Sequence, residues 1–199
     1  MADYRLYAAL AYVVLLAAYD VAADFMSPAV AVYVFAVLET AFLASFRWIK
    51  LRYSSRGFYN SLFLFFMWYM GLVLISPLLS SRGAAAEIQS LYAQGLFPVL
   101  IVVYMLEEPL VSESIFRGIL FQQISTRNRA AAYLVSSLAY ALLMVSPETP
   151  TDLIAAVLYF LLGLIFAYAY ERGGFTSALM VHAVYSALYA LSLVLSLYL

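Results

Sequence analysis

The sequence predicts an all-α polytopic membrane protein with about seven transmembrane helices. Of its 199 residues, 67% are hydrophobic and 11% are charged, and the mean hydropathy is +0.96. A soluble domain of this length would carry about twice that charged fraction. The apolar residues fall into long runs separated by short polar segments, which is the pattern of a chain that crosses a bilayer repeatedly.

The first half of the chain holds three of the expected spans. Residues 4–25 form an apolar run, and Pro28 opens a second run over 28–48, because proline suits the first turn of a helix. A basic loop follows, and the third span, 57–79, is rich in aromatic residues. Each run is close to the length of about 20 residues that crosses the hydrocarbon layer. Residues 84–93 predict a short interfacial helix.

The second half of the chain holds four more expected spans. Their ranges are 97–125, 130–146, 152–171 and 175–198. Pro98 and Pro109 predict a kink or a break in the first of these, because proline removes a backbone donor. Thr151 is expected to cap the third, and Gly173-Gly174 are expected to end it.

The basic residues predict that the N-terminus is cytoplasmic. With seven spans and the N-terminus inside, eight of the ten Lys and Arg residues fall on the cytoplasmic side. Arg82 falls outside and Arg117 lies within the membrane. This bias is what the positive-inside rule expects of an integral protein of the cell membrane.

Composition also excludes several classes of function. A net charge of −1 offers no basic surface for nucleic acid, and the lack of cysteine excludes thiol catalysis and cysteine-ligated metals. A single histidine, His182, excludes a multi-histidine metal site within one chain. We therefore expect no cofactor and no metal. No linker or internal repeat divides the chain, so residues 1–199 are expected to form one membrane domain.

Residues 107–118 place three carboxylates and an arginine inside an apolar span. Charged groups cost several kcal/mol each in hydrocarbon, by most estimates, so they need partners or a purpose. Glu113 and Arg117 are four residues apart in the favourable acid-first order, which predicts a structural ion pair. Glu107 and Glu108 are candidate cavity acids that line a water-filled space, unless one of them is protonated.

Two further polar residues lie inside predicted spans. His182 is a candidate for hydrogen bonding between packed helices, because Ala183, Ser186 and Ala190 nearby are small enough to permit close approach. Glu39 is either the partner of a polar group elsewhere or a neutral acid shielded from lipid.

Three segments of the second half share a pattern of motifs. Residues 109–120 read Pro-x-x-Ser-Glu-x-x-Phe-Arg-Gly-x-Leu, 136–144 end Tyr-x-x-x-Met, and 176–186 contain His-x-x-x-Ser. These resemble the motifs Pro-x-x-Glu-Glu-x-x-Phe-Arg-Gly, Phe-x-x-x-His and His-x-x-x-Asn of the CPBP family, the CAAX prenyl-protein endopeptidases and similar bacteriocin-processing and abortive-infection proteins. The resemblance implies a CPBP-like helical bundle over 97–198, whereas 1–95 carry no motif.

The resemblance also implies a catalytic site that this chain has largely lost. Active members use the first motif's glutamate and the second motif's histidine to activate water, and the last histidine and asparagine to stabilise the oxyanion. Here these four positions are Ser112, Met144, His182 and Ser186. Glu113 and His182 are the candidate catalytic residues that remain, and the others are remnant positions. A general base must be able to hold a proton, so the pattern indicates a retained fold with lost proteolysis.

The first functional hypothesis is therefore a catalytically inactive member that acts as a scaffold, an accessory subunit or a membrane binding module. Membrane lipid and a protein partner within the bilayer are the expected partners. The alternative is an active intramembrane endopeptidase, with Glu108 in place of the missing carboxylate or with Ser112 as nucleophile and His182 as base. A small transporter that uses Glu39, Glu107 and Glu108 is a third hypothesis, although no pair of broken repeats supports it.

Overall fold

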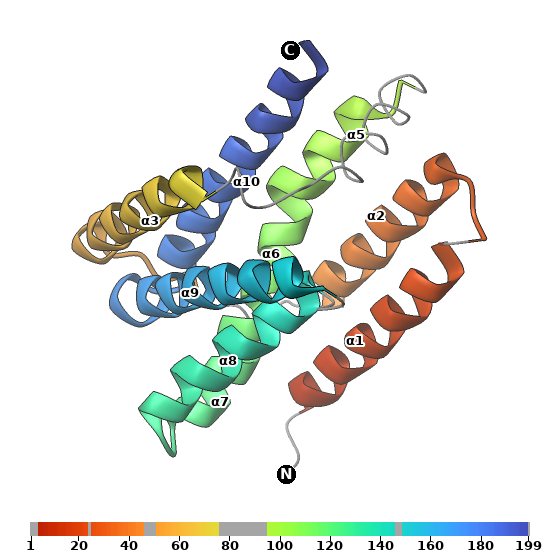
Figure 1. Cartoon of the computed structure of the whole chain (residues 1–199). Coiled ribbons are helices and arrows are strands. Elements are labelled where there is room, and N and C mark those ends of the chain that lie inside the picture. Colours follow the sequence, from red (N-terminus) through yellow and green to blue (C-terminus); the bar gives the residue numbers. More distant parts are fainter. Residues whose placement is uncertain (1–3, 24, 46–50, 76–94, 146–148, 199) are drawn as a thin grey trace. The chain divides into compact units, whose positions relative to one another are not determined.

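The computed structural model describes residues 4–23, 25–45, 51–75, 95–145 and 149–198. Within these residues the regular elements form seven helical stretches and no strand, which confirms the all-α prediction (Figure 1). The chain divides into two compact units. Unit 1 comprises Met1–Trp48, Ser81–Val111 and Tyr185–Leu199, and unit 2 comprises Ile49–Ser80 and Ser112–Val184. That the whole chain acts as one domain stays a prediction.

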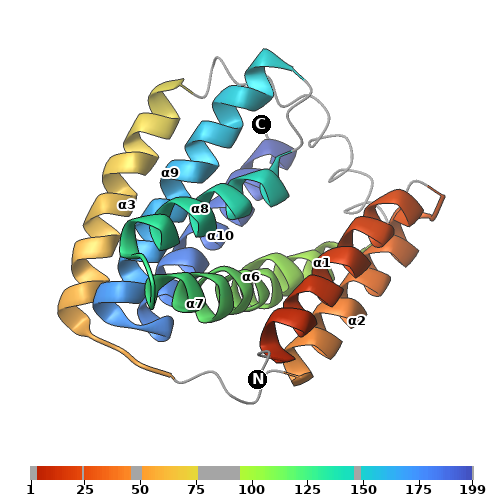
Figure 2. The same cartoon turned by 90° about the horizontal axis from the view of Figure 1, so that it is seen from below.

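Unit 1 contains the antiparallel pair α1 (Tyr4–Ala23) and α2 (Pro28–Ser45), which lie side by side in Figures 1 and 2. The rings of Tyr12 and Phe42 are 4.3 Å apart, and the hydroxyl of Tyr19 donates to the carbonyl of Ala31 at 3.0 Å. Both expected helices are confirmed. Proline begins α2 as predicted, because its missing N–H has no helical acceptor at that position.

The predicted fourth span is one uninterrupted helical stretch, drawn in green in Figure 2. Its parts are α5 (Phe97–Val102), the π-helical η2 (Val103–Glu107), α6 (Glu108–Glu113), the π-helical η3 (Ser114–Phe121) and α7 (Gln122–Ser125).

The predicted break at the prolines does not occur. Pro98 lies in the first turn of α5, where no N–H is needed. Before Pro109 the helix widens into η2, and the N–H of Glu108 donates five residues back to the carbonyl of Val103. The wider turn accommodates Pro109, which has no backbone N–H to donate, and the chain continues as a helix.

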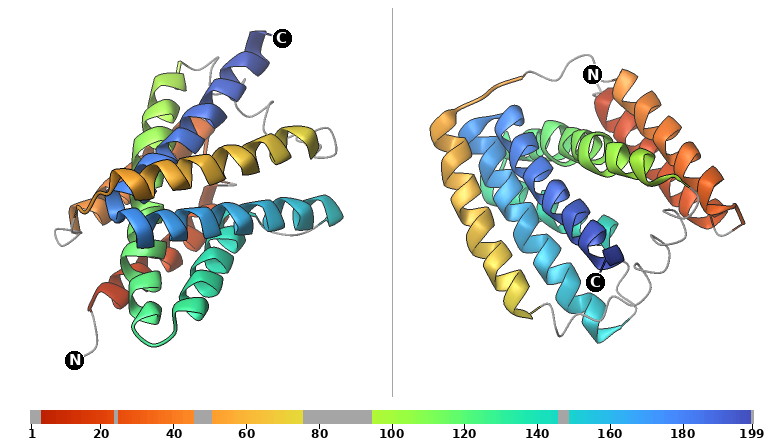
Figure 3. Two further views of the ribbon diagram at one scale, coloured as in Figure 1. Left: turned by 90° about the vertical axis from the view of Figure 1, so that its left-hand side faces the viewer. Right: turned by 90° about the horizontal axis from the view of Figure 1, so that it is seen from above.

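Unit 2 is built around α9 (Pro150–Gly173), which packs against α3 (Ser55–Ile75) and α8 (Arg129–Met144) (Figure 3). The indole N–H of Trp68 on α3 donates to the carbonyl of Leu158 at 3.1 Å. At the other end of this contact, a Cβ on Gly57 would lie 2.6 Å from backbone atoms of Arg172 and Gly173. Glycine at this position therefore lets the two helices meet backbone to backbone.

The ends of these helices follow local rules with one correction. Asn128 caps α8 by accepting from the N–H of Ala131 at 3.0 Å. Thr149, and not the expected Thr151, caps α9, through a reciprocal capping box with Asp152. The reason is that Pro150 takes the first helical position, which moves the cap one residue ahead of it.

Glycine separates the last two helices of the chain. Gly174 has a φ of +86°, a conformation that L side chains rarely adopt, and it ends α9 directly before α10 (Phe175–Tyr198). The break at Gly173-Gly174 is therefore confirmed.

Three of the described helices are long and apolar enough to cross a membrane by length and composition: Ser55–Ile75, Thr151–Gly173 and Phe175–Ser192. Tyr7–Ala23, Ala29–Leu43 and Arg129–Met144 are shorter apolar helices. The expected interfacial helix over 84–93 lies outside the described residues. The cytoplasmic position of the N-terminus stays a prediction.

Candidate functional site

Glu113, Arg117 and His182 meet inside unit 2 and are called the polar cluster below. The Nδ1 atom of His182 lies 3.0 Å from Oε1 of Glu113, and Nε of Arg117 lies 3.5 Å from its Oε2. All three side chains have an exposed fraction of 0%. Sequence alone predicted the pairing of Glu113 with Arg117 but not the contact with His182.

Helix geometry places these side chains. Glu113 is the last residue of α6 and Arg117 lies in the first turn of η3, so both project to one side of the same stretch. His182 lies on α10, two turns after its first residue, Phe175. The contact between His182 and Glu113 therefore ties α10 to the stretch that carries the first motif.

Arg117 is held by one carbonyl and three aromatic rings. Its Nη2 donates to the carbonyl of Gly163 on α9 at 2.8 Å. Its Cζ lies 5.1 Å from the ring centroid of Tyr140, 5.4 Å from that of Phe166 and 5.8 Å from that of Phe116. These distances are within the range of cation–π attraction, which is strongest where water is excluded. Nη2 is thus hydrogen-bonded, whereas Nε and Nη1 have no hydrogen-bond partner among the described residues and rely on the nearby carboxylate and rings.

The imidazole of His182 is fixed by two of the same rings. It stacks on Phe166 with centroids 4.3 Å apart and planes 19° apart, and Tyr140 meets it edge-on at 5.8 Å. Tyr140 occupies the position that resembles the phenylalanine of the second motif. That position therefore supplies a ring that contacts both Arg117 and His182.

The charges of the polar cluster balance. An ionised carboxylate only accepts hydrogen bonds, so against ionised Glu113 the Nδ1 atom of His182 carries the proton and donates. Arginine stays charged in proteins. The carboxylate and the guanidinium of Arg117 then cancel, and a neutral imidazole adds no charge. A buried pair of this kind is stable only while both partners are present.

The remnant positions carry two hydroxyls and a thioether, and none of these is an effective general base near neutral pH. Ser112 is buried on α6, directly before Glu113, and Met144 is half-buried as the last residue of α8. Ser186 is buried one turn after His182 on α10 and belongs to unit 1. These residue types differ from the carboxylate, imidazole and amide that the family motifs hold at the same positions. That these three positions are remnants of a lost catalytic site, and that Glu113 and His182 are its remaining catalytic residues, stays a prediction.

The predicted cavity acids lie in unit 1 with Glu39. The hydroxyl of Tyr12 donates to Oε1 of Glu39 at 3.5 Å, and that of Thr40 donates to Oε1 of Glu107 at 3.2 Å. Glu107 and Glu108 are electrostatic neighbours of Glu39, which is buried. Among the described residues, no His, Asp or Glu group of three or more has the geometry to hold a metal ion.

Sequence reasoning missed two members of the site. Gly163 accepts from Arg117, and a Cβ on it would lie 3.0 Å from Cα of Ser137, so α8 and α9 approach closely there. A glycine inside an apolar helical run is the available signal for such an approach. Phe166 has no comparable signal, because it is one of 14 phenylalanines in an apolar sequence.

Long apolar helices around a buried polar cluster support a helical membrane protein. Residues 94–188 match the family described as Type II CAAX prenyl endopeptidase Rce1-like. The match covers just under half of the chain and confirms the resemblance to the CPBP family drawn from the three motifs. No curated protein and no solved structure matches the chain.

Proposed function

We propose that this CAAX protease-like membrane protein does not cleave peptides and acts as an accessory subunit or binding module within the bilayer. The observation that carries the proposal is the state of its polar cluster. Glu113, Arg117 and His182 are fully buried and paired with one another. The positions that resemble the water-activating pair hold Ser112 and Met144, and neither can serve as a general base near neutral pH.

The geometry of Glu113 favours a structural role. One of its oxygens lies 3.0 Å from Nδ1 of His182 and the other faces Arg117. If Glu113 turned to activate a water molecule, Arg117 would lose its counter-charge in a buried position, which typically costs about 3–5 kcal/mol. A carboxylate whose charge is needed for stability is poorly suited to act as a general base. The cluster instead holds α10 and η3 together.

One observation favours the second candidate, an endopeptidase with atypical residues. The contact between Glu113 and Nδ1 of His182 has the form of the acid–histidine pairs of hydrolases, in which the acid orients the imidazole as a base. In that case His182 is the base and Glu113 its orienting acid. The exposed fraction of 0% at His182 argues against this candidate, because the base must meet water and substrate.

A cleavage assay separates the two candidates. The purified full chain is reconstituted in vesicles and incubated with a farnesylated peptide, beside an active CAAX prenyl endopeptidase as positive control. We expect no more product than in protein-free vesicles. Product that forms with the wild type and disappears with His182→Ala would overturn the proposal and establish the second candidate.

The role as an accessory subunit has its own test. The chain is extracted from its native membrane in a mild detergent, and the proteins that accompany it are quantified after crosslinking. We expect one integral membrane protein in a fixed ratio to the chain, since most exposed side chains are apolar. A chain that is recovered alone under crosslinking would contradict the role as an accessory subunit.

A further inference from the structure

We propose that unit 2 carries a binding site for a phosphate group, of the kind that an anionic phospholipid presents, in a pocket where α7, α8, α9 and α10 come to their ends. The pocket has a volume of about 440 Å³. Its polar lining includes Arg52, Gln122, Ser125, Arg129 and Glu171. None of these residues belongs to the polar cluster, so the proposal does not depend on whether the chain cleaves peptides.

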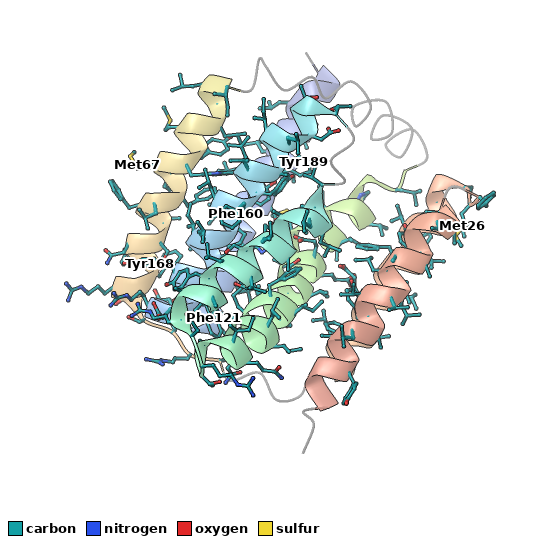
Figure 4. All side chains as sticks on the ribbon, turned by 60° about the horizontal axis from the view of Figure 1, so that its bottom comes forward. Met26, Met67, Phe121, Phe160, Tyr168 and Tyr189 are labelled. Carbon is teal, nitrogen blue, oxygen red and sulfur yellow. The ribbon has the colours of Figure 1, made fainter. Side chains whose placement is uncertain are left out.

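The position of the pocket suits a lipid headgroup. It is lined by Gly174 and Phe175, at the turn that joins α9 to α10. Both helices are long and apolar enough to cross a membrane, so their shared turn lies at a membrane surface. Figure 4 shows nitrogen-tipped side chains gathered at this end of unit 2, near the labelled Phe121 and Tyr168. Phosphate groups and arginines meet at the same depth there.

Among the described residues, the charges that line the pocket leave Arg52 without an ion-pair partner. Glu171, the acid of the lining, is bound by Arg129 through contacts of 2.5 and 2.6 Å, and the hydroxyl of Tyr133 donates to it at 2.8 Å. Its charge is therefore offset by Arg129, whose pKa is raised by this hydrogen bond. Arg52 forms no ion pair with any described residue. The pocket keeps a net positive charge at Arg52.

The backbone around Arg52 is held in place before any ligand binds. The carbonyl of Arg52 accepts from the N–H of Thr176 at 3.1 Å. A Cβ on Gly174 would collide with the carbonyl oxygen of Arg52, so this approach requires glycine. The anchored backbone lowers the entropy that binding would otherwise cost. A guanidinium donates two parallel hydrogen bonds to phosphate, and Gln122 and Ser125 supply further polar groups.

Binding of short-chain lipids to the full chain in detergent tests the proposal. The probe is dihexanoyl-phosphatidylglycerol, and dihexanoyl-glycerol, with the same acyl chains but no phosphate, is its control. We expect Arg52→Gln to weaken binding of the phospholipid at least about tenfold, since hydrogen bonds between charged groups contribute about 1.5–3 kcal/mol. Arg52→Lys should weaken it less, because the charge is kept.

Arg56→Gln is the matched control, because Arg56 is exposed on the first turn of α3 and does not line the pocket. It should change the affinity less than twofold. Competition by inorganic phosphate would show that a soluble anion reaches the site, and its failure would show that the lipid is the source. Equal affinity of the wild type and Arg52→Gln, equal losses in Arg52→Gln and Arg56→Gln, or equal binding of dihexanoyl-glycerol would overturn the proposal.

Discussion

Each of the two units contains a buried acid, and the two acids have different kinds of partner. In unit 2, Glu113 faces the guanidinium of Arg117 and the imidazole of His182, and all three side chains are fully buried. In unit 1, Glu39 is buried as well, but its described partner is the neutral hydroxyl of Tyr12. Glu113 therefore faces a positively charged group, whereas Glu39 accepts one hydrogen bond among the described residues.

This difference separates two roles for acids inside a membrane protein. A nearby positive charge favours the ionised form of a carboxylate. The loss of either partner then leaves a charge that the apolar surroundings cannot solvate. Glu39 has no ion-pair partner among the described residues, and its electrostatic neighbours Glu107 and Glu108 are acids as well, so its loss would leave no described cation without a counter-charge. Glu113 should therefore carry a large share of the stability of unit 2, whereas Glu39 should carry little of the stability of unit 1.

Glu113→Gln should have the largest effect on stability. Glutamine keeps the shape of the side chain but leaves Arg117 without its counter-charge, so we expect the free energy of unfolding to fall by about 3–5 kcal/mol. Denaturant titration in detergent micelles measures the change. The double variant Glu113→Gln/Arg117→Met, which removes both charges, should regain part of the loss. A cost below about 1 kcal/mol for Glu113→Gln would show that the pair is not structural.

Gly57→Ala should destabilise unit 2 to a smaller extent. The new methyl group would lie 2.6 Å from backbone atoms of Arg172 and Gly173, so α3 and α9 must move apart. Overpacking of this kind typically costs about 1–3 kcal/mol. Gly71→Ala on the same helix is the control, because no atom of the described residues beyond the adjoining helix backbone would lie within 4 Å of its Cβ. It should be neutral or slightly stabilising in the same titration, and equal losses in both variants would contradict the close contact.

Glu39→Gln should have the smallest effect. The glutamine oxygen still accepts from the hydroxyl of Tyr12, and no ion pair to a described residue is lost. We expect a change below about 1 kcal/mol in the free energy of unfolding, since one neutral hydrogen bond is kept. This variant repeats the chemistry of Glu113→Gln in the other unit. If the two substitutions cost the same, the contrast between the units is wrong.

Local features of the sequence predicted most of the fold. Apolar runs placed the helices within a few residues of their ends, and Gly173-Gly174 marked the last turn. Of the kink or break predicted from the prolines, the break does not occur at Pro109, because η2 provides a wider turn before it. Thr151 was expected to cap α9, but Thr149 is the cap. Pro150 takes the first helical position, and the cap lies directly before it.

Of the two contacts within the polar cluster, the sequence predicted only one. Glu113 and Arg117 are four residues apart, so helix geometry alone brings them together. His182 is 69 residues from Glu113, and nothing local to either residue encodes their contact. The ring of Phe166 on His182 depends on how α9 and α10 pack, which no spacing along the chain reveals.

The central claim is that the polar cluster serves stability and not catalysis, and His182→Ala tests it most directly when unfolding and cleavage of a farnesylated peptide are measured on the same preparation. Loss of the buried ring and of its hydrogen bond to Glu113 should lower the free energy of unfolding by roughly 2–4 kcal/mol. Cleavage should stay at the level of protein-free vesicles in both the wild type and the variant. Cleavage by the wild type that vanishes in a variant of unchanged stability would contradict the claim.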